Sequence, residues 1–141
     1  MSAEADIRRL FEHWATAIRA RDVDASLAHY APDVLAFDLI NPLQYARSDA
    51  VRTRLESWFS SFGGPIGYEN RDLTITAGED VAFAHSLNHV DATTKDGQKL
   101  DMWWRATLCF RKLDGDWVVS HSHTSVPFDM DTGKASLELE P

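Results

Sequence analysis

Two Asp-Gly pairs, Asp96-Gly97 and Asp114-Gly115, constrain the fold of this chain more than any other feature. Each pair lies between segments in which apolar and polar residues alternate. Asp-Gly in that setting is the strongest short-range signal for a β-hairpin with a two-residue loop. The alternation predicts four strands, at about 67–77, 80–94, 98–112 and 116–127. The second half of the chain is therefore expected to form an antiparallel meander.

The first half carries apolar residues at helical spacing instead. One apolar stripe recurs at three- and four-residue steps and comprises Ile7, Leu10, Phe11, Trp14 and Ile18. A shorter helix is expected at about 24–30, a short strand at about 34–38 and a third helix at about 49–62. Helices that precede a meander favour the α+β class over alternating βαβ units.

Size and charge narrow the class of protein. The chain has 141 residues, so we expect a single domain over 1–141 with an acidic C-terminal tail at 128–141. A formal net charge of −8 disfavours binding to nucleic acid or to anionic membrane surfaces. No apolar stretch approaches the roughly 20 residues of a transmembrane helix, and the acidic N-terminus lacks the features of a signal peptide. Cys109 is the only cysteine, and a cytoplasmic location is expected.

The hairpins also predict which residues share a face of the sheet. If both loops have two residues, Leu108 lies opposite His85 and His121, and Ala106 lies opposite His123. The residues expected on the apolar inner face are Val81, Phe83, His85, Leu87, His89, Met102, Trp104, Ala106, Leu108, Phe110, Trp117, Val119, His121, His123 and Ser125. A slip of one residue reverses the faces of a strand, so this assignment depends on both loop lengths.

Four of the six histidines fall at one end of this apolar face, near Trp104 and Ser125. An apolar wall interrupted by a few polar groups is typical of small-molecule pockets. The sequence therefore predicts a pocket for a small, largely apolar molecule with one or two polar groups. The opposite face is polar and is free for solvent or for a dimer contact.

Three parts of the chain together resemble a known family. They are the aromatic first helix, the run Tyr30-Ala31-Pro32-Asp33-Val34 leading to Asp38, and the closing Gly115-Asp116-Trp117-Val118-Val119-Ser120-His121-Ser122-His123-Thr124-Ser125-Val126-Pro127. They resemble the SnoaL-like and ketosteroid-isomerase-like branch of the nuclear transport factor 2 (NTF2-like) superfamily. The resemblance implies an α+β, NTF2-like cone, with N-terminal helices packed on a strongly curved mixed or antiparallel sheet, and usually a homodimer.

The resemblance also implies a role for Asp38, which matches the general base of ketosteroid isomerase by its spacing from Tyr30. The first helix carries His13 and Trp14 where that isomerase has a tyrosine. The expected chemistry is proton transfer without a cofactor, an isomerisation or a dehydration next to a carbonyl group.

The expected site combines the resemblance with the predicted inner face. Asp38, His121 and His123 are the predicted catalytic residues, because a histidine beside a carboxylate forms an acid–base pair near neutral pH. The predicted ligand-binding residues are Trp14, His85, His89, Met102, Trp104 and Ser125. The expected partners are a small-molecule ligand and a second copy of the chain, bound through the outer face of the sheet.

Two other hypotheses remain open from the sequence. The first is a ligand-binding or dimerisation module without catalysis. The second is a metal site formed by His85, His89 and His121, since imidazoles on adjacent strands can converge. His85 and His121 would stand about 10 Å apart on a flat sheet, so the metal site requires strong curvature.

Overall fold

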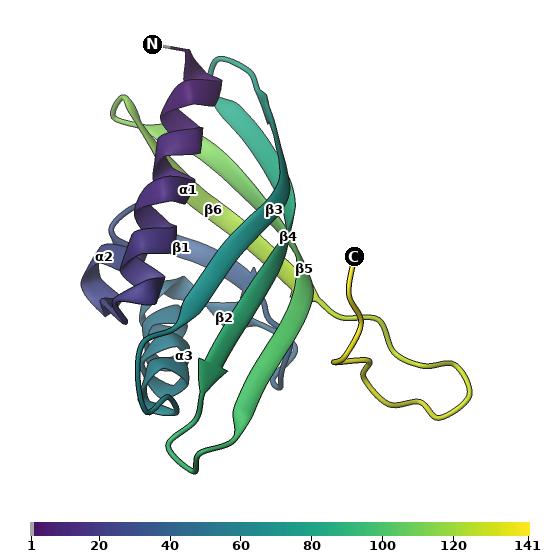
Figure 1. Ribbon diagram of the computed structural model, residues 1–141. Helices are drawn as coiled ribbons and strands as arrows, with labels where there is room; N and C mark the ends of the chain where they lie inside the picture. Colours follow the sequence, from purple (N-terminus) through teal and green to yellow (C-terminus); the bar gives the residue numbers. More distant parts are fainter. Residues whose placement is uncertain (1) are drawn as a thin grey trace.

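The structure is a computed structural model that describes residues 2–141. Three helices, α1 (Ala3–Arg19), α2 (Val23–Leu27) and α3 (Arg47–Ser60), pack on one face of a curved sheet (Figure 1). The strands are β1 (Tyr30–Phe37), β2 (Tyr45–Ala46), β3 (Gly67–Ala77), β4 (Val81–Thr93), β5 (Lys99–Leu113) and β6 (Asp116–Ser125). Their order is β2-β1-β6-β5-β4-β3, with β1 parallel to β6 and the other pairs antiparallel. The predicted α+β class and the curved, mixed sheet are confirmed.

The first helix begins at a capped N-terminus and buries the predicted apolar stripe. The Ser2 hydroxyl accepts a hydrogen bond from the Ala5 amide, which satisfies one of the free amides of the first turn. Phe11 and Trp14 pack on Phe110 of β5, with ring centroids 6.2 and 6.1 Å apart. This aromatic contact holds α1 on the inner face of the sheet.

The first hairpin differs from its prediction. Asp96-Gly97 is part of a longer loop between Thr93 and Lys99, which are paired. The Gly97 amide donates to the Thr94 carbonyl at 3.0 Å, and Gly97 has a φ of 81°. A turn followed by a glycine in the left-handed region adds one residue to the loop.

The extra residue reverses the predicted faces of β4. Phe83 lies opposite Cys109 and not opposite Phe110. The inward side chains of β4 are Ala82, Ala84, Ser86, Asn88, Val90 and Ala92, all of them buried. The outward ones are Val81, Phe83, His85, Leu87, His89 and Asp91. The assignment of His85 and His89 to the inner face was therefore wrong.

The second hairpin has the predicted two-residue turn, but its register shifts further along. Leu113 pairs with Asp116 and Phe110 with Val119, as expected. A bulge at Ser120 then places Cys109 opposite His121. A bulge leaves one extra residue on one strand and so turns the following side chains to the other face.

Beyond this bulge, the predicted faces of β6 are also reversed. Ser122 and Thr124 point inward, toward Leu108 and Ala106. His121, His123 and Ser125 lie on the outer face, so their assignment to the inner face was wrong as well.

Residues 126–141 leave the end of β6 and run away from the helices (Figure 1). A turn orders this arm, in which the Asp129 carboxylate accepts from the amides of Asp131 and Thr132. Phe128 is 62% exposed there. No helix within residues 2–141 is both long and apolar enough to cross a membrane.

Candidate functional site

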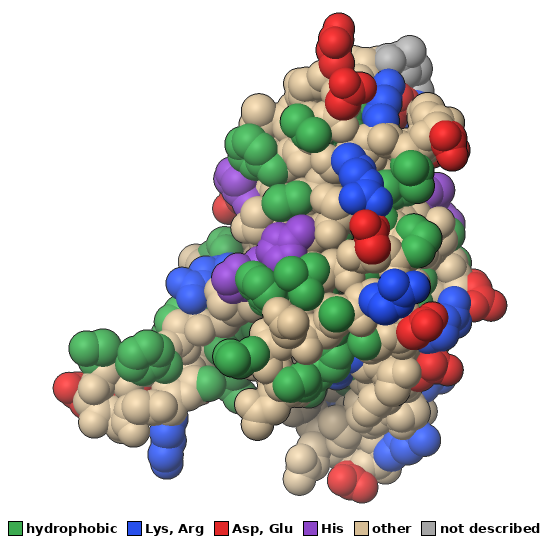
Figure 2. Space-filling view, turned by 180° about the vertical axis from the view of Figure 1, so that it is seen from behind, with side chains coloured by type: hydrophobic (Ala, Val, Ile, Leu, Met, Phe, Trp, Pro, Cys, Tyr) green, Lys and Arg blue, Asp and Glu red, His purple; other side chains and the backbone are tan. Residues whose placement is uncertain are grey.

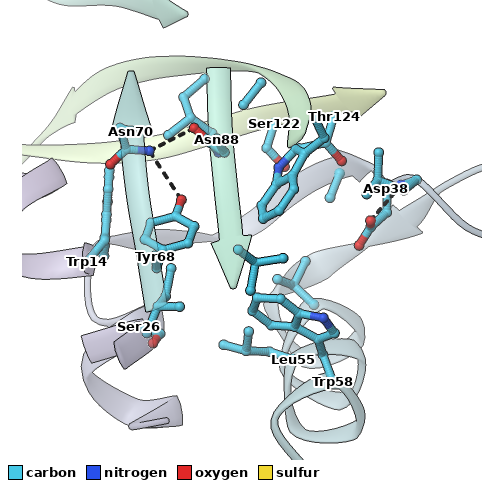
Figure 3. Close-up of a pocket in the computed structure, with 18 of the residues that line it drawn as sticks. Trp14, Ser26, Asp38, Leu55, Trp58, Tyr68, Asn70, Asn88, Ser122 and Thr124 are labelled. Atoms are coloured by element: carbon cyan, nitrogen blue, oxygen red, sulfur yellow. Dashed lines mark hydrogen bonds between the residues drawn. The ribbon is translucent and has the colours of Figure 1, made fainter. Parts of the chain in front are cut away.

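A pocket of about 230 Å³ lies between the helices and the inner face of the sheet (Figure 3). Its walls are mostly aromatic and aliphatic. Trp104 of β5 meets Trp58 of α3 and Tyr68 of β3, with ring centroids 6.4 and 6.1 Å apart. Trp14 and Met102 line other parts of the wall. An apolar cavity with few polar groups suits a small organic ligand.

One polar group in the pocket is a chain of hydrogen bonds across β3 and β4. The Asn70 amide nitrogen donates to the Asn88 oxygen at 2.7 Å and to the Tyr68 hydroxyl at 3.2 Å. The Ser86 hydroxyl donates to the same Asn88 oxygen at 2.7 Å. Ser86 and Asn88 are each 7% exposed, so these bonds satisfy polar atoms that would otherwise be buried without partners. Figure 3 shows Tyr68, Asn70 and Asn88 grouped on one side of the pocket.

Two hydrogen-bond donors in this network of Tyr68, Asn70, Ser86 and Asn88 remain unused. The Asn88 amide nitrogen and the Tyr68 hydroxyl proton have no acceptor within residues 2–141. Burial raises the pKa of Tyr68 to about 12, although the hydrogen bond from Asn70 opposes that change. Tyr68 is therefore a neutral phenol near pH 7 and can donate to a ligand oxygen.

Tyr30, at the start of β1, supplies a second phenol. Its ring packs edge-on against Trp14, with centroids 6.0 Å apart. Burial raises the pKa of Tyr30 far above its ordinary value, and the nearby Tyr68 and Asp38 raise it further. The Tyr30 hydroxyl lines the pocket and has no hydrogen-bond partner in the described part of the chain. It is thus a free neutral donor in the pocket, near enough to Tyr68 and Asp38 for both to raise its pKa.

Asp38 follows β1 and lies across the pocket from Tyr68, Asn70 and Asn88 (Figure 3). One of its carboxylate oxygens accepts from the Leu39 amide. The other oxygen lies 3.2 Å from Nε of Arg54 on α3. The two side chains are 25% and 21% exposed, so this ion pair sits at a partly shielded edge of the pocket. Asp38 is the only acidic side chain among the lining residues.

The structure brings together only part of the predicted site. Trp14, Asp38, Met102 and Trp104 all line the pocket. The other predicted residues are absent from its lining and lie on the outer face: His85, His89, His121, His123 and Ser125.

The outward histidines make contacts of their own. His121 Nδ1 lies 2.6 Å from the Leu35 carbonyl oxygen, and Phe37 packs against the rings of His121 and His123. Figure 2, seen from behind, shows histidines and hydrophobic side chains side by side on the surface of the molecule. These contacts give His121 and His123 structural partners on β1.

The metal-site hypothesis has no geometric support. Within residues 2–141, no three or more side chains of histidine, cysteine, aspartate or glutamate converge as metal ligands. His85 lies on β4 and His121 on β6, with β5 between them.

His89 forms an acid–base cluster on the outer face. Its ring nitrogens lie 2.7 Å from Asp101 and 3.3 Å from Glu69, and its ring stacks on Trp103 at 4.4 Å. Partial burial lowers the pKa of His89, but the hydrogen bonds to Asp101 and Glu69 outweigh it, so the net change is a raised pKa.

The raised pKa predicts a pH-dependent loss of stability in His89→Gln. A histidine whose pKa is raised on folding stabilises the protein fully below about pH 6.5, its unfolded value, and this contribution disappears as pH rises through the folded pKa. The free energies of unfolding of wild type and variant should therefore differ most at acidic pH and converge at alkaline pH. Urea unfolding across this range measures the difference. Asp101→Asn should reproduce most of it, whereas a difference that stays constant with pH would contradict the prediction.

The register errors also hid several pocket residues. Arg54 and Tyr68 carry no motif that marks them, and Tyr30 stands out only as the start of the run that leads to Asp38. Ser86, Asn88, Ser122 and Thr124 are missing from the predicted inner face because of the two one-residue shifts. One signal was available: β4 alternates small residues with large ones, and a pocket requires the small set to point inward.

This chain is similar to a known protein family and to solved structures. The family profile of the SnoaL-like domain matches residues 7–129. An NTF2-like protein of unknown function from Pseudomonas putida is 39% identical, over 100% of this chain and 99% of that one, with a TM-score of 0.89. No curated protein matches the chain.

Two more distant solved structures share the fold. A ketosteroid isomerase-like protein from Erwinia carotovora atroseptica is 23% identical, over 89% of this chain and 97% of that one, with a TM-score of 0.74. An uncharacterized protein with a cystatin-like fold from Caulobacter vibrioides is 16% identical, over 91% of each chain, also at 0.74.

Proposed function

Because this chain belongs to the SnoaL-like family of the NTF2-like superfamily, we propose that it binds a small carbonyl compound and moves a proton on it without a cofactor. The observation that carries the proposal is a single carboxylate, Asp38, at an apolar pocket that also holds the free donors of Tyr30, Tyr68 and the Asn88 amide. That combination supplies a base and oxyanion stabilisation in one cavity.

The donors define what the ligand must carry. Tyr30, Tyr68 and the Asn88 amide all offer protons to the pocket. A ligand that buried them without an acceptor would leave them unsatisfied, at a cost of about 1–3 kcal/mol for each group. A carbonyl oxygen satisfies a donor, and it does so more strongly once negative charge develops on it. The aromatic walls then favour an apolar, ring-sized body.

Asp38 is the base in this reaction. It removes a proton from the carbon next to the carbonyl, so that a C–H bond breaks and an O–H bond forms on the carboxylate. The electron pair moves onto the carbonyl oxygen, which becomes an enolate held by neutral donors such as Tyr30. Return of the proton from Asp38 to another carbon of a conjugated enolate gives an isomer. Transfer of that proton to a β-hydroxyl, which leaves as water while the C–O bond breaks and a C=C bond forms, gives a dehydrated product.

The relatives support the class of reaction only through the fold. The Erwinia protein is described as ketosteroid isomerase-like, but at 23% identity it shows shared architecture and not shared chemistry. Helix α1 carries Trp14 where ketosteroid isomerase has a tyrosine. The two phenols of this pocket, Tyr30 and Tyr68, come from β1 and β3. We therefore leave the carbonyl substrate broader than a steroid.

A direct test uses 2-tetralone, a bicyclic ketone with acidic protons next to its carbonyl. The protein is expected to accelerate exchange of those protons for deuterium, followed by NMR in D₂O. Binding is measured in parallel by quenching of tryptophan fluorescence, because Trp14, Trp58 and Trp104 line the pocket. Saturable binding of 2-tetralone without accelerated exchange would indicate a ligand-binding protein without this catalytic activity.

We also propose that two copies associate through the outer sheet face. Val81 and Phe83 are 66% and 46% exposed there, and Phe83 lies opposite the half-buried Cys109. Covering large apolar side chains favours association.

Phe83→Arg is accordingly expected to weaken self-association at least tenfold, or by about 1.4 kcal/mol, because it buries an unpaired charge. Sedimentation velocity over a range of concentrations measures the change. Phe128→Arg, on the arm outside this face, is the matched control and should associate like wild type. A wild-type chain that stays monomeric at the highest concentration would rule out the dimer.

A further inference from the structure

Within residues 2–141, Arg54 is less bonded than most arginines, although Arg47 and Arg71 also donate no hydrogen bond. Arg19, Arg21, Arg52, Arg105 and Arg111 each donate hydrogen bonds of 2.8 to 3.1 Å. Arg54 lines the pocket and is 21% exposed, yet it makes no hydrogen bond within the described residues. Its Nε is buried without a partner of suitable geometry.

Within residues 2–141, the sole ionic neighbour of Arg54 is the proposed base. Asp38 lies within ion-pair distance of Nε, at 3.2 Å, but the N–H does not point at the carboxylate well enough to form a hydrogen bond. A guanidinium cannot lose its proton in a protein, and it has five N–H donors in a fixed fork. Arg54 therefore contributes a permanent positive charge and unfilled donors to the end of the pocket where Asp38 lies.

We propose that Arg54 is a counter-ion shared by Asp38 and the ligand. In the empty pocket it balances the Asp38 carboxylate. When Asp38 takes a proton, the carboxylate becomes neutral and the negative charge appears on the ligand oxygen, which Arg54 then pairs with. The net charge at this end of the pocket is the same before and after the transfer.

This inference rests on the proposed function and names its substrate class. The ligand is a ketone, or a related carbonyl compound, whose enol-type oxygen reaches the Arg54 end of the pocket in ionised form. A permanently anionic carboxylate ligand is disfavoured, because it would repel the Asp38 carboxylate and the single positive charge of Arg54 cannot balance both.

The experiment uses 2-naphthol, the aromatic counterpart of the enol of 2-tetralone. Naphthol and naphtholate have separate absorption spectra, so the ionised fraction of the bound probe is measured without any catalytic step. Asp38→Asn stands in for the protonated base and leaves Arg54 without its anion. In this variant, the ratio of the affinity for naphtholate to the affinity for naphthol is expected to be at least tenfold higher than in wild type. This ratio is called the naphtholate preference.

Removing the guanidinium should abolish that gain. Asp38→Asn combined with Arg54→Met is expected to lose tenfold or more of the naphtholate preference, and combination with Arg54→Lys should keep part of it. Arg52→Met in the same background is the matched control, since Arg52 lies two residues earlier on α3 and pairs with Asp24 outside the pocket. The lysine variant keeps the test informative if the methionine variant does not fold.

The outcomes separate this inference from the proposed function. Equal naphtholate preference in the Arg54→Met and Arg52→Met combinations would overturn the role of Arg54, even if wild type catalyses exchange of 2-tetralone. Failure of wild type and all folded variants to bind 2-naphthol saturably would overturn it too. If the naphtholate preference depends on Arg54 but the protein does not accelerate exchange of 2-tetralone, the result would support Arg54 as a counter-ion and refute the proposed catalysis.

Discussion

Asp38→Asn is expected to slow deuterium exchange of 2-tetralone by roughly 10²- to 10⁴-fold, the usual contribution of a positioned general base. Asparagine keeps the shape of the side chain and an oxygen that can accept from the Leu39 amide. It cannot take up the substrate proton at neutral pH. Binding of the ketone should change little, because the walls formed by Trp104 and Trp58 are untouched. The loss should therefore appear in the rate at saturating ketone and not in the affinity.

Asp33→Asn is the matched control for this variant. Asp33 lies on β1, the strand that Asp38 follows, but its side chain is 63% exposed and pairs with Arg111 at 2.8 Å outside the pocket. It should leave exchange at the wild-type rate. An Asp38→Asn protein that still exchanges protons as fast as wild type would show that another group, or no group, is the base.

Phe110→Ala is expected to lower the free energy of unfolding by about 3–5 kcal/mol, the range for deleting a buried phenyl ring. Phe110 is 2% exposed and packs on Phe11 and Trp14, so its removal leaves a cavity where α1 meets the sheet. Urea or thermal unfolding measures the loss.

Phe128→Ala makes the same chemical change at a side chain that is 62% exposed on the arm, and it should stay within about 0.5 kcal/mol of wild type. Equal losses in the two variants would contradict the packing of α1 on β5.

The features predicted correctly are those that depend only on periodicity and on long segments. The stripe of α1 needs a period near four, and the strands from Gly67 onward need a period near two. The positions of Trp14 and Asp38 at the pocket follow from those elements and from the family resemblance. None of these depends on the exact length of a loop.

The faces of β4 and of the end of β6 depend on single residues, and there the prediction failed. A loop containing Gly97 and a bulge at Ser120 each add one residue. Hydrophobicity also misled the assignment on β4, because its outward side chains include Phe83 and Leu87 while its inward ones are small. The assumption that large apolar residues point inward does not hold over a cavity, since a ligand site requires missing side-chain volume.

The small inward residues of β4 and β5 also make the cavity adjustable by substitution. Ala84 and Ala106 line the pocket with single methyl groups, on strands whose backbone pairing does not depend on them. An added carbon at Ala106 would take space from the guest, whereas Ala84 also belongs to the core cluster in which α1 packs on Phe110. Relatives with the same backbone can thus accept guests of different size through changes at one or two such positions. The positions of Asp38, Tyr30, Tyr68 and Arg54 need not change.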